Sequence, residues 1–319
     1  MGWRHDADDR RYFSSFNQDN LIMTFDTRPI LVLGATGAQG GGVVRALLGA
    51  GTSVRAFVRD ATSADAKALE AAGAILCEGD MDDRASLDRA VAGAKGAFSV
   101  QVASIDSDYE LRTGRAIIDA AYEADVDMFV HTSVARAGDH TAFTGWDEGR
   151  WGKAYWENKA AVNEAVRERG FKRYVILKPA FMMENFALPR STGMFLSLAQ
   201  GRLDTAYLPD TRIHLIGAAD IGAFALAAFA GPDRFHGAEI DLAAEALTME
   251  EIADALAAGT GQPVAAQSLS AQEAVRRGMR EGVAQNQLWA NEEGYKVDIQ
   301  ALPRWGVPLR LFFQLGRGE

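Results

Sequence analysis

The stretch from Ile30 to Gly40 constrains this chain more than any other. It reads ILVLGATGAQG, a short apolar run followed at once by glycines spaced as GxxGxxG. An apolar periodic segment comes next, so the order predicts a strand, a tight turn and the start of a helix. Glycines let a backbone approach a pyrophosphate, and a helix N-terminus offers unpaired N–H groups and partial positive charge. The stretch therefore predicts dinucleotide binding through Gly34, Thr36, Gly37, Ala38, Gln39 and Gly40.

Apolar strands and helical patterns alternate regularly beyond this turn. The expected strands are 30–33, 53–58, 74–77, 96–102, 128–132 and 173–177. The expected helices are 41–50, 63–73, one capped by Asp82 or Asp83 that ends at Gly93, 108–124 and 153–169. Such alternation predicts an α/β Rossmann fold, a doubly wound parallel sheet with right-handed crossovers. Its switch point is expected between the first and fourth strands, where ligands bind at the carboxyl ends of the strands.

The pattern changes after Pro179, where short elements and loops follow. We expect a strand at 213–216, a helix at 220–230, a strand at 240–242, and a helix that Thr248 and Glu251 open as a capping box. The coenzyme domain is predicted to comprise 28–182 with the returning segment 212–245. A smaller α/β substrate-side lobe is predicted from 183–211 and 246–319. Residues 1–27 lack any period and are predicted to form a mobile extension; the alternative is an arm that packs on a partner subunit.

Composition excludes several classes of function. The 319 residues are 48% hydrophobic with a net charge of −10, which argues against a nucleic-acid surface. No apolar run is long enough for a membrane span. The one cysteine, Cys77, cannot form an internal disulfide, in keeping with a cytoplasmic protein. The five histidines are scattered and no cysteine pair exists, so no metal site is predicted.

The end of the second strand predicts which coenzyme is bound. An acidic residue there accepts hydrogen bonds from a ribose 2′-OH, whereas a guanidinium suits a 2′-phosphate. The strand VRAFVRD ends with Arg59 followed by Asp60. Arg59 favours NADP(H) over NAD, although the residue can also be a solvated loop charge. Asp60 leaves two possibilities, a cap of the following turn or the ribose ligand.

Other strand ends supply further candidates. Asp80 follows the third strand, where it can accept from the adenine amine while Met81 covers the ring; the alternative for Asp80 is a helix cap. Val100 and Gln101 end the fourth strand and are expected beside the nicotinamide ribose, unless Gln101 only hydrogen-bonds locally. Thr132 ends the fifth strand and is expected on the coenzyme side, although it can also pair with backbone.

The candidate chemistry lies on the helix AYWENKAAVNEAV. Tyr155 and Lys159 are four residues apart, so they share one helix face. A nearby ammonium favours the phenolate form of Tyr155, which predicts a general acid/base with Lys159 beside it. The Lys159 ammonium can also bind ribose hydroxyls. Ser133 is the candidate to hold a substrate carbonyl. The alternatives are an amphipathic surface aromatic for Tyr155 and a backbone-paired hydroxyl for Ser133.

Taken together, these residues resemble the NmrA-like family, an atypical branch of the short-chain dehydrogenases/reductases. The resemblance is carried by GATGAQG, FVRD, GDMDDRASL, AIIDAAYEADVDMFVHTSV, NKAAVNEAV and ILKPAFMMENF, and it extends over about 29–265. It implies an NADP-preferring Rossmann fold. Members commonly keep a lysine at the position of Lys159 but lack the tyrosine found here. The segment from Lys178 resembles the nicotinamide-side loop, which implicates Pro179 and Phe181.

The resemblance leaves two functions open. Some relatives reduce quinones or other carbonyl-like substrates, which predicts an NADPH-dependent reductase of a small apolar carbonyl or quinone. Others bind the dinucleotide as redox sensors, which predicts a regulator acting through a protein partner, with the aromatic-rich loop 143–156 as its docking site. A homodimer is compatible with either function, and neither a membrane nor a nucleic acid is an expected partner. An epimerase or dehydratase of a nucleotide sugar is the weaker third interpretation.

Overall fold

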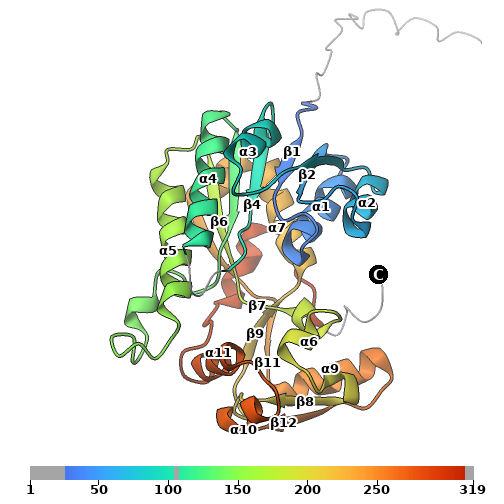
Figure 1. The fold of residues 1–319 in the computed structure, drawn as a ribbon, viewed down its shortest axis with the longest axis vertical. Coiled ribbons are helices and arrows are strands. Elements are labelled where there is room, and N and C mark those ends of the chain that lie inside the picture. Colours follow the sequence, from blue (N-terminus) through green and yellow to red (C-terminus); the bar gives the residue numbers. More distant parts are fainter. Residues whose placement is uncertain (1–25, 104–107, 313–319) are drawn as a thin grey trace, which may run out of the picture.

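Seven parallel strands form the central sheet of the computed structural model, which describes residues 26–103 and 108–312 (Figure 1). Their order is β10–β6–β5–β4–β1–β2–β3. The strands are β1 (Ile30–Val32), β2 (Val54–Val58), β3 (Ile75–Glu78), β4 (Gly96–Ser99), β5 (Met128–Thr132), β6 (Tyr174–Pro179) and β10 (Ala238–Leu242). Because β1 pairs with both β2 and β4, the switch point lies where the sequence predicts it.

Helices cover both faces of this sheet. One face carries α3 (Arg84–Val91), α4 (Tyr109–Glu123) and α5 (Lys153–Glu168), and the other carries α1 (Ala38–Gly49), α2 (Ala64–Ala71), α7 (Ala218–Ala230) and α8 (Pro232–Phe235) (Figure 1). Side chains of β1 and of Leu33, which follows it, alternate between the two cores. Ile30 and Val32 pack with α1 and α7, whereas Leu31 and Leu33 pack with α3, α4 and α5. This alternation with both faces buried is typical of a parallel sheet. No helix in the described residues is long and apolar enough to cross a membrane.

A smaller lobe lies at the carboxyl ends of the strands (Figure 1). The chain enters it directly from β6 into β7 and from β10 into β11. Strands β7 (Phe181–Met182), β9 (Ile213–Ile216) and β11 (Glu245–Leu247) form one small sheet, and β8 (Arg202–Thr205) pairs with β12 (Ala265–Ser268). The helices are α6 (Ser191–Met194), α9 (Met249–Thr260), α10 (Ala271–Arg276) and α11 (Glu281–Glu292), with short 3₁₀ turns at 140–142, 183–186, 198–200 and 299–305.

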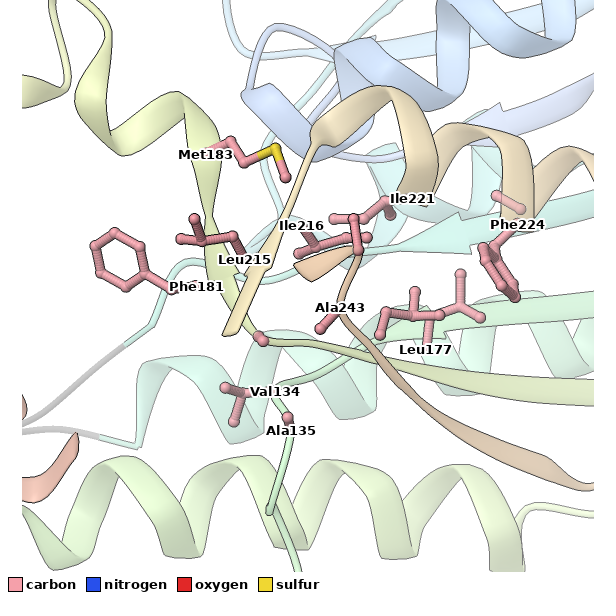
Figure 2. Packing of buried hydrophobic residues seen from close by; sticks show 14 of the residues in the cluster. Val134, Ala135, Leu177, Phe181, Met183, Leu215, Ile216, Ile221, Phe224 and Ala243 are labelled. Atoms are coloured by element: carbon pink, nitrogen blue, oxygen red, sulfur yellow. The ribbon is translucent and has the colours of Figure 1, made fainter. Parts of the chain in front are cut away.

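Apolar side chains join the lobe to the main sheet (Figure 2). Leu177 on β6, Ile216 on β9 and Ile221 on α7 are fully buried and belong to one core. Figure 2 shows Ala243, which follows β10, beside them. The orientation of the lobe is therefore set by a continuous core.

Most predicted elements are confirmed, and two strand ends are corrected. The fourth strand was expected to reach residue 102, but β4 ends at Ser99, where its register with β5 also ends. The sixth strand runs past the expected end at 177 to Pro179. Pro179 is tolerated there because its carbonyl accepts from the Ala135 N–H at 3.0 Å, and the sheet needs no backbone N–H donor at this position.

Two helix caps also follow the sequence. Asp83 caps α3 by accepting from the Ala85 N–H, and Thr248 and Glu251 form the expected capping box of α9. The division into domains stays a prediction, and β9, within the segment assigned to the coenzyme domain, pairs with β7 and β11. Of the predicted extension, residues 1–25 lie outside the described residues.

Helices α1 and α7 touch through their backbones. A Cβ on Gly42 would lie closer than 3.0 Å to the Ala218 carbonyl, and a Cβ on Gly222 equally close to the Gly42 carbonyl. Each site therefore accepts only glycine without a shift of one helix. This contact sets the distance of α1 from α7.

We expect Gly222→Ala to lower the free energy of unfolding by about 1–3 kcal/mol, because the added methyl group overpacks a backbone contact. Gly49→Ala is the matched control, since a Cβ there meets nothing within 4 Å. The control should be neutral or more stable by up to about 1 kcal/mol. Urea unfolding of both variants measures the difference. Equal stabilities would contradict the close contact.

Two carboxylates lie at the N-terminus of α7. Asp220 Oδ1 accepts from the Arg310 N–H at 3.1 Å, and Glu184 Oε1 accepts from the Ala218 N–H at 2.7 Å. Burial raises the pKa of Asp220 to about 6, against hydrogen bonds that lower it. Between pH 3.8 and about 6, Asp220 in the folded protein therefore still holds a proton that the unfolded chain has released.

This raised pKa makes Asp220 destabilising above its titration range. Its favourable contribution is complete below the unfolded value of 3.8 and is lost as the pH rises through about 6. Asp220→Asn, which keeps the neutral form at all pH values, should therefore gain stability relative to wild type between pH 4 and pH 7. Urea unfolding at both pH values measures the difference. A constant difference would show that Asp220 does not titrate as proposed.

Candidate functional site

The glycine turn after β1 is built from close backbone contacts. Gly34 adopts φ +59°, and a Cβ on it would lie 2.6 Å from Val100 Cγ1 at the end of β4. The Gly37 N–H donates to the Gly34 carbonyl at 2.8 Å. A Cβ on Gly40 would clash with that same carbonyl. The turn thus depends on glycine at two of its three positions, and the Val100 side chain packs directly against it.

The N-terminus of α1 opens at this turn. Gly37 is its N-cap and provides no side-chain cap, and no acidic residue lies in the first turn. The first N–H groups of a helix have no partner within it, and the helix dipole adds partial positive charge. This end of α1 is therefore suited to an anion.

Thr132 joins the glycine turn to the end of β5. Its hydroxyl donates to Gln39 Oε1 at 2.6 Å, and Thr132 is buried. Two residues predicted separately to contact the coenzyme are therefore neighbours at the carboxyl edge of the sheet. Thr36, in the same turn, is exposed.

The end of β2 separates the roles of Arg59 and Asp60. Asp60 Oδ1 accepts from both the N–H and the hydroxyl of Thr62, at 2.7 and 2.6 Å. Hydrogen bonding from Thr62 lowers the pKa of Asp60, so the carboxylate is held in its own turn. Arg59 is exposed, and its guanidinium has no ion pair or hydrogen bond within the described residues. Of the two possibilities for Asp60, the turn cap is the one present.

The end of β3 has a similar local arrangement. Asp80 is exposed and its Oδ1 accepts from the Asp82 N–H at 2.9 Å, while Met81 is half-buried. Tyr109, at the start of α4, is a neighbour that sequence reasoning missed. Burial, with the charges of Asp82 and Asp80, raises the pKa of its phenol, while Arg59 lowers it. Tyr109 therefore lies close enough to the ends of β2 and β3 for charged residues there to affect its phenol.

A buried polar chain lies under the switch point. Gln101 Nε2 donates to Ser99 Oγ at 2.7 Å, and His131 Nδ1 lies 3.4 Å from the same oxygen. Burial and the charge of Lys159 lower the pKa of His131 to about 3, so its imidazole is neutral. For Gln101, the local hydrogen bond that the sequence left as an alternative is present.

Lys159 is paired with a residue that the sequence did not single out. Its Nζ lies 2.6 Å from Glu110 Oε1, across the contact between α4 and α5, and both side chains are buried. The ammonium also lies 5.9 Å from the centroid of the Tyr155 ring. The helix thus places Tyr155 and Lys159 on one face, as their spacing predicts.

The surroundings of Tyr155 within the chain disfavour its phenolate form. Burial raises the pKa of its phenol above the ordinary value, and Tyr295 and Glu110 raise it further. Because Glu110 neutralises the Lys159 charge, the ammonium does not draw the phenol toward ionisation. The ring is held edge-on against Trp156, with 5.2 Å between centroids. Tyr155 is therefore a neutral hydroxyl, able to donate a proton.

Ser133 follows Thr132 at the end of β5. Its N–H donates to the Leu177 carbonyl at 2.8 Å. Its Oγ is buried and has no hydrogen-bond partner in the described part of the chain. A buried hydroxyl without a partner carries a free-energy cost, so it is an unusual feature beside a candidate site.

The end of β6 and the start of β7 make structural contacts. Lys178 Nζ lies 3.2 Å from Glu239 and 3.6 Å from Asp241, on the neighbouring β10. The Phe181 ring packs against Phe186 and Phe195, at centroid distances of 5.7 and 6.3 Å. Phe181 and Phe186 thus form part of an aromatic cluster in the lobe.

The loop 143–156 is covered by the chain's own lobe. Phe143, Trp146, Trp151 and Trp156 are all buried. Trp156 packs on Trp289 of α11 with 4.9 Å between centroids. Ion pairs and hydrogen bonds fasten the loop to α11, among them Arg150 with Glu292 and the Thr144 N–H with Glu293. The aromatic side chains that suggested partner docking are therefore engaged within the chain.

Glu110 is the most informative residue that the sequence analysis missed. It lies on the buried stripe of α4 with Thr113, Gly114 and Ile117. An acidic residue at helical spacing within an apolar stripe signals a buried charge partner. This signal was available from periodicity alone.

The comparisons with known proteins agree with the fold. The sequence model of the NmrA-like family matches residues 26–303. A relative from Xenophilus azovorans named NAD(P)H azoreductase is 30% identical over 273 residues, covering 82% of this chain and 86% of that protein. An NADPH-dependent quinone oxidoreductase from Escherichia coli, crystallised with NADPH, matches with a TM-score of 0.70 and 23% identity over 90% of this chain and 98% of that one. The negative transcriptional regulator NmrA, crystallised with NADP, matches with a TM-score of 0.71 and 19% identity over 92% and 95%. The two solved structures establish a shared fold.

Proposed function

Because this chain belongs to the NmrA-like family, we propose that it binds NADP(H) and acts as a reductase of a small apolar carbonyl compound or quinone. The observation that carries the proposal is the α1 N-terminus, which has a glycine N-cap and no acidic residue in its first turn. Such an end binds phosphate through N–H groups and the helix dipole. The names of the azoreductase and the quinone oxidoreductase point to the same class of chemistry.

The coenzyme would lie across the carboxyl edge of the sheet. The N–H groups of Ala38, Gln39 and Gly40 would hold the pyrophosphate, at a turn whose close contacts leave no room for a Cβ on Gly34 or Gly40. Arg59 would pair with the 2′-phosphate, since a guanidinium matches phosphate geometry. The hold of Thr62 on Asp60 supports this choice, because the carboxylate is engaged away from a ribose.

The remaining contacts follow from the strand ends. Asp80 and Met81 are proposed on the adenine side, and Val100, Gln101 and Thr132 near the nicotinamide ribose. Lys159 would bind ribose hydroxyls. Pro179 and Phe181 are proposed near the nicotinamide, although their observed contacts are structural.

The chain's own contribution to chemistry is a proton and an oriented substrate. The bound coenzyme supplies hydride from C4 of its nicotinamide. Tyr155, held neutral by burial, is a proton donor for the oxygen that gains charge as the carbonyl carbon accepts hydride; water is the alternative donor. The free hydroxyl of Ser133 supports a role in holding that oxygen.

A non-catalytic NADP(H) sensor acting through a protein partner is the second candidate. It is favoured by the solved regulator of the same fold. It has less support here because the aromatic residues of loop 143–156 are buried within the chain. Tight NADPH binding without oxidation of NADPH by quinones, azo dyes or aldehydes would favour the sensor.

Arg59→Ala should weaken NADPH binding by about 10–100-fold, because it removes a charged hydrogen-bond donor to phosphate. NADH binding should change little. Arg89→Ala is the control, because it removes a different exposed arginine, which lies on α3. Calorimetric titration with both coenzymes measures the effect. Equal loss for NADPH and NADH would place Arg59 outside the 2′-phosphate site.

Tyr155→Phe should lower kcat for quinone or azo-dye reduction by about 100-fold or more, the range usual for a general acid. NADPH affinity should be unchanged. Tyr122→Phe, on the exposed face of α4, is the matched control. Steady-state NADPH oxidation over a panel of quinones, azo dyes and aldehydes measures both. Turnover that survives in Tyr155→Phe would assign the proton to water.

A further inference from the structure

A buried ion pair lies directly behind the candidate chemistry. Lys159 and Glu110 leave 9% and 2% of their side chains exposed, and their charged atoms are 2.6 Å apart. Removing two charges from water carries a large free-energy cost, which a single ion pair seldom recovers in full. Simple stabilisation is therefore a weak explanation for it.

The two helices are built to bring these charges together. Gly114, one turn beyond Glu110, allows α4 to approach α5, since a Cβ there would lie 2.9 Å from Val162. Val162 is in turn three residues beyond Lys159. Glu110 also lies in the first turn of α4, where the helix dipole favours a carboxylate. Helix position and close packing both place the Glu110 carboxylate near Lys159.

We infer that Glu110 is a positioning residue that holds the Lys159 ammonium beside Tyr155, and thereby keeps the lysine charged and the tyrosine protonated. The inference rests on the role proposed above for Tyr155 and Lys159. Reduction needs this combination, because the phenol must still carry the proton that it donates and the ammonium must be available to ribose hydroxyls.

The charges around the pair support this assignment. Lys159 faces Glu110 from α4, His131 from β5 and Tyr155 from its own helix. His131 is neutral, and an imidazole in either of its forms has no negative charge that could balance the ammonium. Tyr155 faces Tyr295 from the lobe, which is neutral because burial raises its pKa. Glu110 is therefore the group that balances the lysine among these neighbours.

Glu110→Gln keeps the shape of the side chain and removes its charge. The Lys159 ammonium would then be buried without a counter-charge, which favours the neutral amine. Tyr155 would lose the carboxylate that disfavours its phenolate. Lys159 and Tyr155 would together lose their first proton at lower pH, so the alkaline limb of the kcat profile should move down by about one pH unit or more.

The matched control is Asp119→Asn. Asp119 pairs with Arg169 at 2.8 Å and joins the same two helices, but at the surface. If the effect of Glu110→Gln came only from losing a contact between α4 and α5, Asp119→Asn should show the same effect. Glu110→Asp, which retains the charge, should restore the wild-type pH profile at least in part.

The experiment has two readouts. The first is NMR titration of isotope-labelled lysine in the coenzyme-free protein, with the Lys159 signal assigned from Lys159→Arg. The second is the pH profile of kcat with the substrate reduced best. A lower titration point for Lys159 and a lowered alkaline limb in Glu110→Gln, with neither in Asp119→Asn, are expected.

Unchanged titration and profile in a folded Glu110→Gln protein would overturn the inference. So would equal effects in Asp119→Asn. Should Glu110→Gln fail to fold, Glu110→Asp becomes the deciding variant. A Lys159 titration point equal to that of wild type would support the inference, and a shifted point would contradict it. If wild type reduces no compound in the panel, the proposed function fails, whereas the lysine titration still decides the role of Glu110.

Discussion

Direct contact between backbones is the constraint on which this structure depends. The turn after β1 folds against its own carbonyl at Gly34, and α1 then rests against α7 through Gly42 and Gly222. Side chains at these positions would separate the elements, because the interior has no room for an added methyl group. These contacts fix where the first N–H groups of α1 point. The site is thus suited to an anion first because packing orients these N–H groups, and second because of the partial charge at the helix end.

Electrostatics at the site is arranged by local pairing. Asp60 is engaged with Thr62, and the neighbouring Arg59 keeps its guanidinium exposed. Glu110 neutralises Lys159, and Tyr155 accordingly stays a phenol. At both places the pairing of one carboxylate affects a neighbouring group: Arg59 stays exposed beside Asp60, and Tyr155 stays protonated near Glu110. A site described only by its cations would predict the wrong protonation state for the tyrosine.

Local patterns predicted the elements well, because strand alternation, helical spacing and capping are properties of neighbouring residues. The glycine turn, the order of β1 between β2 and β4, and the Thr248 cap all follow from such patterns. The positions that sequence reasoning missed depend on contacts between distant segments. The Tyr155 phenol is affected by Glu110 and Tyr295, which come from α4 and from beyond α11. Burial of the loop aromatics likewise depends on Trp289, which lies on α11, far from the loop in the sequence.

The attachment of that loop to α11 bears on how the site can work. Tyr155 stands at the edge of the aromatic cluster formed by Phe143, Trp156 and Trp289, which spans the main sheet and the lobe. Stacked and edge-on rings hold each other more firmly than isolated side chains do. The tyrosine is therefore positioned by the lobe as well as by its own helix. In the proposed reductase, a substrate would meet a side chain held by both parts, so the lobe would contribute to the site by fixing the proposed proton donor in place.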